Sequence, residues 1–198
     1  MQASLLSLLM IAAVAIPNAA PARSGQEREY KRTFSAANLD ELYIDFPIGK
    51  LEIEGTSTDQ IEVEVSVECE GWRARSCRER ADRVELEPSH DGDRLELAFT
   101  GFSKWRNGGM HINMKIRLPA PLDLAVDMSI GEVSLRMREA DVGRLSMDTG
   151  IGESSLVTPA GRSASAGLFT RELRWEEGHG EARIHIDLGI GEVAVRLS

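Results

Sequence analysis

The sequence predicts an all-β protein, a single domain of short strands whose C-terminal half repeats like a β-solenoid. A six-residue motif recurs along the chain, and apolar and polar residues alternate on both sides of it. The composition, with 18 glycines and only 5% aromatic residues, suits many short strands and tight turns better than a large helical core. An immunoglobulin-like sandwich, also built from short alternating strands, is the alternative.

The N-terminus is typical of a secretory signal peptide. Residues 2–16 form an apolar run without a charge, and small residues follow up to Ala22. A membrane span needs about 20 apolar residues, so we expect a cleaved signal over residues 1–22, with a retained anchor as the alternative. No later segment approaches that length, so no membrane span is expected after cleavage. A disordered segment over 23–33 and a domain over 34–198 should follow, in the periplasm or outside the cell.

The two cysteines, Cys69 and Cys77, are expected to pair. In an oxidising compartment an isolated pair usually forms a disulfide. Free buried thiols and a metal site are the alternatives, but a metal would need further ligands, and the nearest histidine is His90.

The recurring motif has the form D-x-x-I-G-[EK]. Its copies are Asp45–Lys50, Asp127–Glu132, Asp148–Glu153 and Asp187–Glu192. The second and third copies start 21 residues apart and the third and fourth 39 apart, so a degenerate unit is expected around 163–175. A period near 20 residues indicates solenoid coils or repeated hairpins, with successive copies stacked on one another.

Each copy reads as strand, glycine corner, strand, because the apolar alternation changes phase at the glycine. A glycine there indicates a positive φ or a close approach that a Cβ would block. The corner glycines are Gly49, Gly131, Gly152 and Gly191. The isoleucines before them are expected in the core: Ile48, Ile130, Ile151 and Ile190. The spacing is not that of a phosphate-binding G-x-G-x-x-G loop.

Between the first and second copies the pattern changes. Residues 61–67 alternate strictly and predict a strand, and residues 72–84 have the spacing of one short amphipathic helix. Further strands are expected over 84–87, 94–99 and 111–118.

Three features together carry a family resemblance: the step Ile48–Ile53 (I-G-K-L-E-I), Leu118-Pro119 with Leu122, and the later I-G-E units. With them the chain resembles, from Phe34 to Leu197, the exported "putative adhesin" domain of unknown function found in bacteria. The resemblance implies a β-solenoid or toast-rack-like stack and no catalytic residues. The Cys69–Cys77 insertion departs from the family's pattern.

Candidate contact residues form an acidic face and three tryptophans. The motif aspartates, Asp127, Asp148 and Asp187 among them, alternate with apolar residues and should point outward as a solvated face. A Ca²⁺ ladder is the alternative, although the nine-residue Ca²⁺-binding repeat is absent. The tryptophans lie in polar settings and are either contact residues or caps on a small core: Trp72, Trp105 and Trp175.

A net charge of −9 without a basic block excludes a typical nucleic-acid binder. No catalytic residue, metal site or cofactor is predicted, because neither G-x-S-x-G nor H-E-x-x-H occurs. We therefore expect a non-enzymatic cell-envelope interaction or scaffold protein, whose partners are other envelope proteins or a second copy. The alternative is a cation- or glycan-binding module that uses the acidic face.

Overall fold

The computed structural model describes residues 26–69, 74–101 and 109–198, and the all-β prediction is confirmed. The predicted signal peptide, Trp72 and Trp105 lie outside these residues. The strands are β1 (Gln26–Ser35), β2 (Glu41–Thr56), β3 (Gln60–Cys69), β4 (Glu85–Asp91), β5 (Arg94–Thr100), β6 (Met110–Pro119), β7 (Asp123–Met137), β8 (Val142–Thr158), β9 (Gly161–Trp175) and β10 (Ala182–Leu197). The helical elements are α1 (Ala74–Ala81) and the 3₁₀ turn η1 (Glu139–Asp141).

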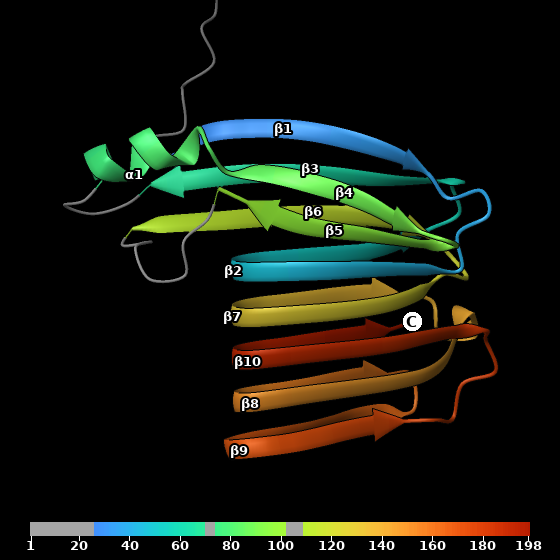
Figure 1. The fold of residues 1–198 in the computed structure, drawn as a ribbon. Coiled ribbons are helices and arrows are strands. Elements are labelled where there is room, and N and C mark those ends of the chain that lie inside the picture. The colour runs from blue at the N-terminus through green and yellow to red at the C-terminus, as the bar shows by residue number, and fades with distance from the viewer. Residues whose placement is uncertain (1–25, 70–73, 102–108) are drawn as a thin grey trace, which may run out of the picture.

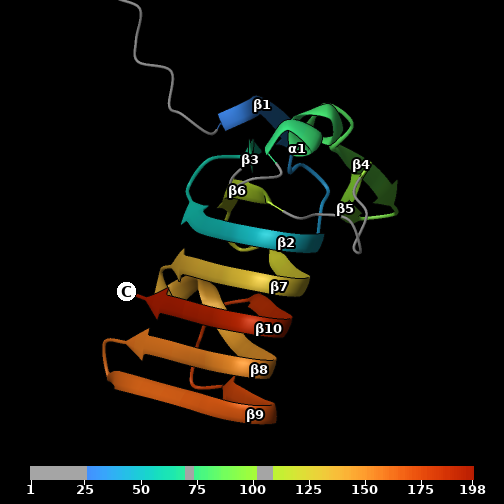
Figure 2. The ribbon, with the colours of Figure 1, turned by 90° about the vertical axis from the view of Figure 1, so that its left-hand side faces the viewer.

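The strands form one sheet in the order β1-β3-β6-β2-β7-β10-β8-β9, with β5 pairing β2, and β4 pairing β5. Figures 1 and 2 show that the long strands β2, β7, β10, β8 and β9 each double back at a bend. The half of each long strand before its bend therefore lies in one layer and the half after its bend lies in a second layer. The bends connect the two layers along one side of the molecule. Because each strand runs through its bend from one layer to the other, the fold is not an immunoglobulin-like sandwich of two separate sheets.

The bends lie at the predicted corner glycines, which share one row of the sheet. Their φ angles run from 134° to 143°, a region that side chains rarely adopt. A Cβ on Gly131 would lie 1.9 Å from the carbonyl oxygen of Gly49, and one on Gly191 would lie 1.8 Å from that of Gly131. Close stacking of the backbones therefore requires a glycine at the bend of each of β2, β7, β10 and β8.

The core fills the space between the two layers. In β7 the inward residues are Leu124, Val126 and Met128 before the bend and Val133 and Leu135 after it, all at most 1% exposed. The parallel register places their equivalents in β2 and β10 directly beside them. The alternation predicted from the sequence thus becomes apolar columns along the stack.

The order of the repeats differs from the prediction that successive copies form successive coils. β10 lies between β7 and β8, so Asp187, and not Asp148, is the neighbour of Asp127. The degenerate unit, β9, runs antiparallel to β8 at the end of the sheet. In this position the backbone N–H and C=O groups on both edges of β10 are hydrogen-bonded, because β10 pairs in parallel with β7 on one side and β8 on the other.

The disorder expected over 23–33 is wrong for the described part of that segment, from residue 26 onward. β1 pairs antiparallel with β3, and Tyr30 and Phe34 pack against the core. The Tyr30 hydroxyl also accepts a hydrogen bond of 3.0 Å from the backbone N–H of Leu86. Two aromatic side chains on one face are enough to anchor a strand that is otherwise highly charged.

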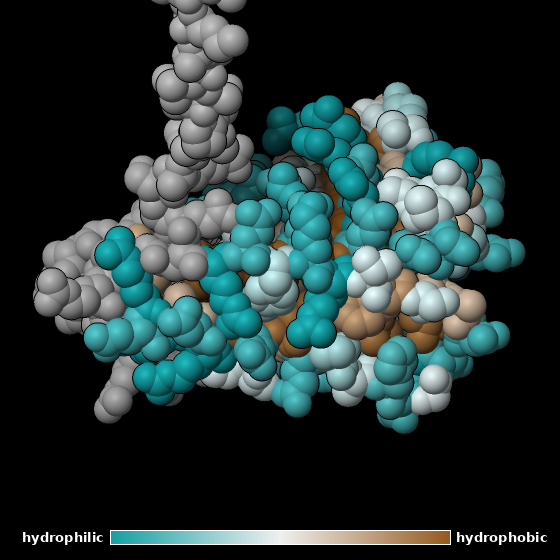
Figure 3. All heavy atoms as spheres, turned by 90° about the horizontal axis from the view of Figure 1, so that it is seen from above, coloured by the Kyte–Doolittle hydropathy of each residue, from teal (hydrophilic) through white to brown (hydrophobic). Residues whose placement is uncertain are grey.

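The predicted helix and disulfide lie beside β3. Cys69 and Cys77 are bonded, with Cα atoms 5.8 Å apart, and Cys77 and Ala81 of α1 are fully buried. Seen from above, the end of the stack at β1 and β4 presents mostly hydrophilic side chains (Figure 3). This end therefore resembles the polar cap that a repeat stack needs where its last coil meets water.

Candidate interaction surface

The isoleucines before the corner glycines are exposed, and the prediction that they are buried is wrong. Ile130, Ile190 and Ile151 are 45%, 46% and 46% exposed, and Ile48 is half-buried. The inward residues Met128 and Val133 are an odd number of positions apart, so strict alternation breaks at the bend. The positive φ of the glycine leaves the isoleucine on the outside of the corner.

These isoleucines form a continuous row, called here the isoleucine ladder: Ile48, Ile130, Ile190 and Ile151. The register pairs Ile130 with Ile48 and Ile190, and Ile190 with Ile151. Neighbouring strands are about 4.8 Å apart, so the row runs along the stack for roughly 14 Å. The bends that carry it face the viewer in Figure 2. Because exposed apolar groups gathered in one place are unusual on a protein surface, this row is the candidate interaction surface.

The motif aspartates form a second row, the aspartate ladder: Asp45, Asp127, Asp187 and Asp148. Asp45, Asp127 and Asp187 are exposed and Asp148 is partly exposed, so they point outward as predicted. Partial burial, and then the nearby carboxylates Glu172 and Asp187, raise the pKa of Asp148 against an opposing effect of His185. Negative charges in this row therefore lie close enough to repel one another.

A third row, the glutamate ladder, lies on the other side of the isoleucines: Glu132, Glu192 and Glu153. Lys50 takes the equivalent place on β2. Glu153 meets Arg162 at a distance of 3.9 Å. Ile130, Ile190 and Ile151 are therefore bordered by carboxylates on both sides, whereas Ile48 has Asp45 on one side and Lys50 on the other.

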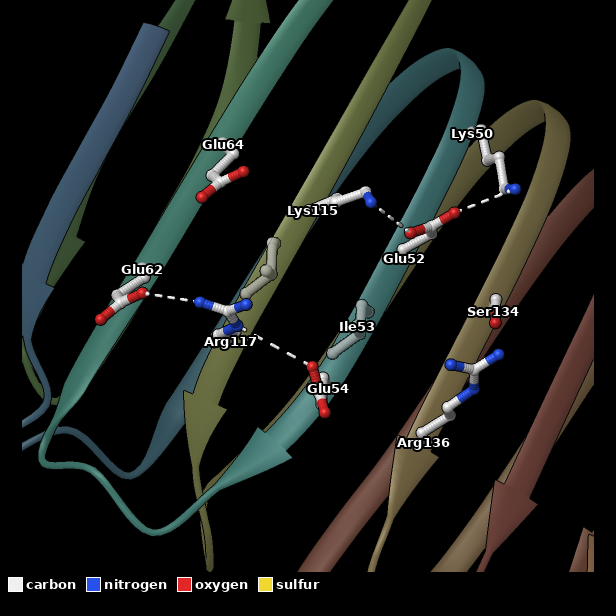
Figure 4. Close-up of a pocket in the computed structure, with 11 residues that line it drawn as sticks. Lys50, Glu52, Ile53, Glu54, Glu62, Glu64, Lys115, Arg117, Ser134 and Arg136 are labelled. Carbon is white, nitrogen blue, oxygen red and sulfur yellow. Dashed lines mark hydrogen bonds and ion pairs between the residues drawn. The ribbon is translucent and has the colours of Figure 1, made fainter.

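Figure 4 shows a different feature, a shallow depression of about 290 Å³ on the outer face of β3, β6, β2 and β7. Lys50 and Lys115 contact Glu52 at 2.9 and 3.2 Å, and Arg117 contacts Glu54 and Glu62 at 3.8 and 3.4 Å. The hydrogen bond from Lys50 lowers the pKa of Glu52. Because opposite charges alternate across the strands and pair, this network contributes to the pairing of the strands.

The remaining predicted contact residue with a described position is Trp175, and it is not on the surface. It is 8% exposed, pairs with Leu145 in register and lies on the inner side of β9 with Leu173. The interpretation of Trp175 as a core cap is therefore correct and its interpretation as a contact residue is wrong. Strand alternation places it inside despite its polar neighbours.

Within 26–69, 74–101 and 109–198, no group of three or more His, Cys, Asp or Glu side chains is arranged to hold a metal ion. In the same ranges no helix is long and apolar enough to cross a membrane.

The chain is similar to several solved structures, among them a "putative cell adhesion protein" from Clostridium sporogenes. It is 11% identical, with a TM-score of 0.41, over 86% of this chain and 99% of that one. A "putative adhesin" from Bacteroides fragilis is 7% identical, with a TM-score of 0.27, over 85% of this chain and 97% of that one. Likenesses this distant carry no information about function. No curated protein matches the chain.

The sequence profile of one family matches residues 22–168, which include the first three copies of the motif. The toast-rack-like resemblance inferred from the I-G-[EK] steps is thereby confirmed. Since the match spans well over half of the sequence, the chain belongs to the family Toast_rack_N, the N-terminal domain of toast_rack, DUF2154.

Proposed function

We propose that the chain is a non-enzymatic interaction module of the cell envelope that binds another protein through the face of its bends. One observation carries the proposal: Ile130, Ile190 and Ile151 stand in register, each at least 45% exposed. Leaving three large aliphatic side chains in water forgoes the stabilisation that burial brings. Binding a partner would recover it.

The ladder is also held rigidly, which favours binding. β10 is paired along nearly its whole length with β7 on one side and β8 on the other, so Ile190 projects from a fixed backbone. A preformed surface loses little conformational freedom on association, and more of the contact energy remains as affinity.

Export is part of this proposal. The apolar run at residues 2–16 supports a signal peptide, and the Cys69–Cys77 disulfide supports an oxidising compartment, the periplasm or the cell exterior. The paired charges of the depression in Figure 4 support a non-enzymatic role, because each of its glutamates has a cationic partner and none is left as a free acid or base.

The test is capture from an envelope extract with residues 23–198 as bait. The variant Ile130→Ser with Ile190→Ser should lose the captured protein, whereas the control Val157→Ser, on the outer face of β8, should retain it. Melting curves check that both variants are folded, which is expected because the replaced isoleucines are nearly half exposed. Equal capture by the double variant and the wild type would refute the proposal.

A further inference from the structure

We propose that the partner presents a basic amphipathic helix, which lies along the isoleucine ladder parallel to the axis of the stack. This inference rests on the proposed function and names the chemistry of the partner. It follows from the charges beside the ladder, from the spacing of its rungs and from the size of the residues next to it.

The charges require cations on the partner. The aspartate ladder lies on one side of the isoleucines and the glutamate ladder on the other. Among the described residues, no ion pair involves Asp127, Asp187 or Glu192, so these carboxylates are available to a partner. An apolar stripe with Lys or Arg along both margins would bury the isoleucines and pair with both rows.

The spacing favours a helix over an extended strand. Adjacent isoleucines are about 4.8 Å apart, so the four rungs span roughly 14 Å. Three turns of an α-helix advance about 16 Å, whereas residues on one side of a strand, about 6.6 Å apart, would cover roughly 20 Å over the same number of contacts. One side chain from each turn of a helix would therefore stay close to one isoleucine along the whole ladder.

Small residues allow a close approach. Between the aspartate and isoleucine ladders, directly before each isoleucine, lie Pro47, Ser129, Gly189 and Gly150, one on each strand. Gly189 and Gly150 have no side chain, and a Cβ on Gly189 would lie 2.6 Å from the carbonyl oxygen of Ser129, so the backbones of β7 and β10 are closely stacked here. A helix about 10 Å across can therefore approach Ile190 and Ile151 without meeting a side chain from Gly189 or Gly150.

The same charges disfavour two other occupants. A second copy docked through the same face would bring acidic ladders opposite acidic ladders, and like charges directly opposed are destabilising. A membrane surface rich in anionic lipids would be repelled in the same way, since it attracts clusters of Lys and Arg. A cationic segment of another protein remains.

The experiment uses two labelled synthetic peptides of 18 residues with the same leucine stripe. One has Lys along both margins and the other has Glu at those positions. Fluorescence anisotropy with residues 23–198 should show the Lys peptide binding about tenfold or more tightly than the Glu peptide, and more weakly as salt rises from about 0.05 to 0.5 M. A Glu peptide that binds as tightly, or a Lys peptide that does not bind, would overturn the inference.

Variants separate the two contributions. Glu132→Gln with Glu192→Gln should weaken the Lys peptide several-fold, and Ile130→Ser with Ile190→Ser should do so as well. The control Glu87→Gln with Glu181→Gln makes the same change in net charge elsewhere and should leave affinity nearly unchanged. An equal effect of both charge variants would mean attraction by net charge alone and would refute docking on the ladder.

The two proposals fail in different ways. If the envelope partner is captured through the isoleucines but the peptides do not differ, the basic helix is wrong and the docking face stands. If the serine variants capture the partner as well as the wild type, the docking face itself is wrong.

Discussion

Replacing Gly191 by alanine should be among the most damaging single changes in the chain. Its φ is 143°, and an added Cβ would lie 1.8 Å from the carbonyl oxygen of Gly131 and 3.1 Å from its nitrogen. Real Cβ atoms essentially never come closer than 3.0 Å, so the rungs of β7 and β10 would have to separate by more than an ångström. Because β8 pairs with the other side of β10, the displacement cannot be confined to one edge.

The cost has two parts. A non-glycine residue in so sparsely populated a backbone region costs about 1–3 kcal/mol. Forcing atoms into a well-packed interior costs a further 1–3 kcal/mol or so. We expect Gly191→Ala to lower the free energy of unfolding by about 2–6 kcal/mol, a large share of what a domain of this size possesses.

Gly161 provides the matched control. Its φ is 154°, but an added Cβ would meet nothing within 4 Å. Gly161→Ala should therefore cost only the backbone strain, about 1–3 kcal/mol. Urea unfolding followed by circular dichroism measures both variants. Equal destabilisation would refute the reasoning, because it would show that close stacking of the glycine row contributes nothing.

Four further predictions concern the aspartate ladder and the disulfide. Asp187→Asn should stabilise the protein by about 0.2–1 kcal/mol and by more than Asp45→Asn, because Asp187 has a like-charged neighbour on both sides and Asp45 on one. Thermal melts compare the two variants. Melts of the wild type with Ca²⁺ and with chelator should coincide, and a midpoint several degrees higher in Ca²⁺ would favour the cation-binding alternative. The raised pKa of Asp148 means that the native state holds this proton more tightly than the unfolded state, so stability falls as pH rises from near 3.8 through the raised value. Asp148→Asn should therefore be more stable than the wild type at pH 7, with an advantage that vanishes in acid; an advantage that grows in acid would contradict this. Replacing Cys69 and Cys77 by alanine should lower the free energy of unfolding by about 2 kcal/mol, since the bridge closes a short loop, and an unchanged urea midpoint would contradict it.

Local sequence was sufficient for the strands and their corners. Period-two alternation on both sides of Gly131 defines two inward faces. The glycine itself indicates a backbone conformation, with positive φ, that residues with a side chain rarely adopt. The repeated motif also predicts rows of identical residues. Parallel strands in register are the one arrangement that places every Asp, Ile and Gly beside its own kind.

The order of the strands could not be read in this way. Copies of one motif are equally suitable as neighbouring strands, so the sequence alone does not say whether Asp148 or Asp187 lies beside Asp127. The choice depends on how β9 turns the chain antiparallel at the end of the sheet, which no periodicity encodes.

The candidate site itself was missed because hydrophobicity was equated with burial. Ile190 is as apolar as Ile186, yet the former is 46% exposed and the latter fully buried. The available signal was the spacing: inward positions Leu188 and Val193 are an odd number of residues apart, so one apolar residue between them had to face outward. Trp175 is the opposite case, a residue with charged neighbours that alternation places inside.

The most direct test of the central claim is site-specific photo-crosslinking in the intact envelope. A photoreactive residue in place of Ile190 lies on the isoleucine ladder, whereas one in place of Ala194 lies on the same strand beyond the bend. The account predicts a discrete covalent adduct with another protein from position 190 and little or none from position 194. No adduct at position 190, or equal adducts at both positions, would contradict it.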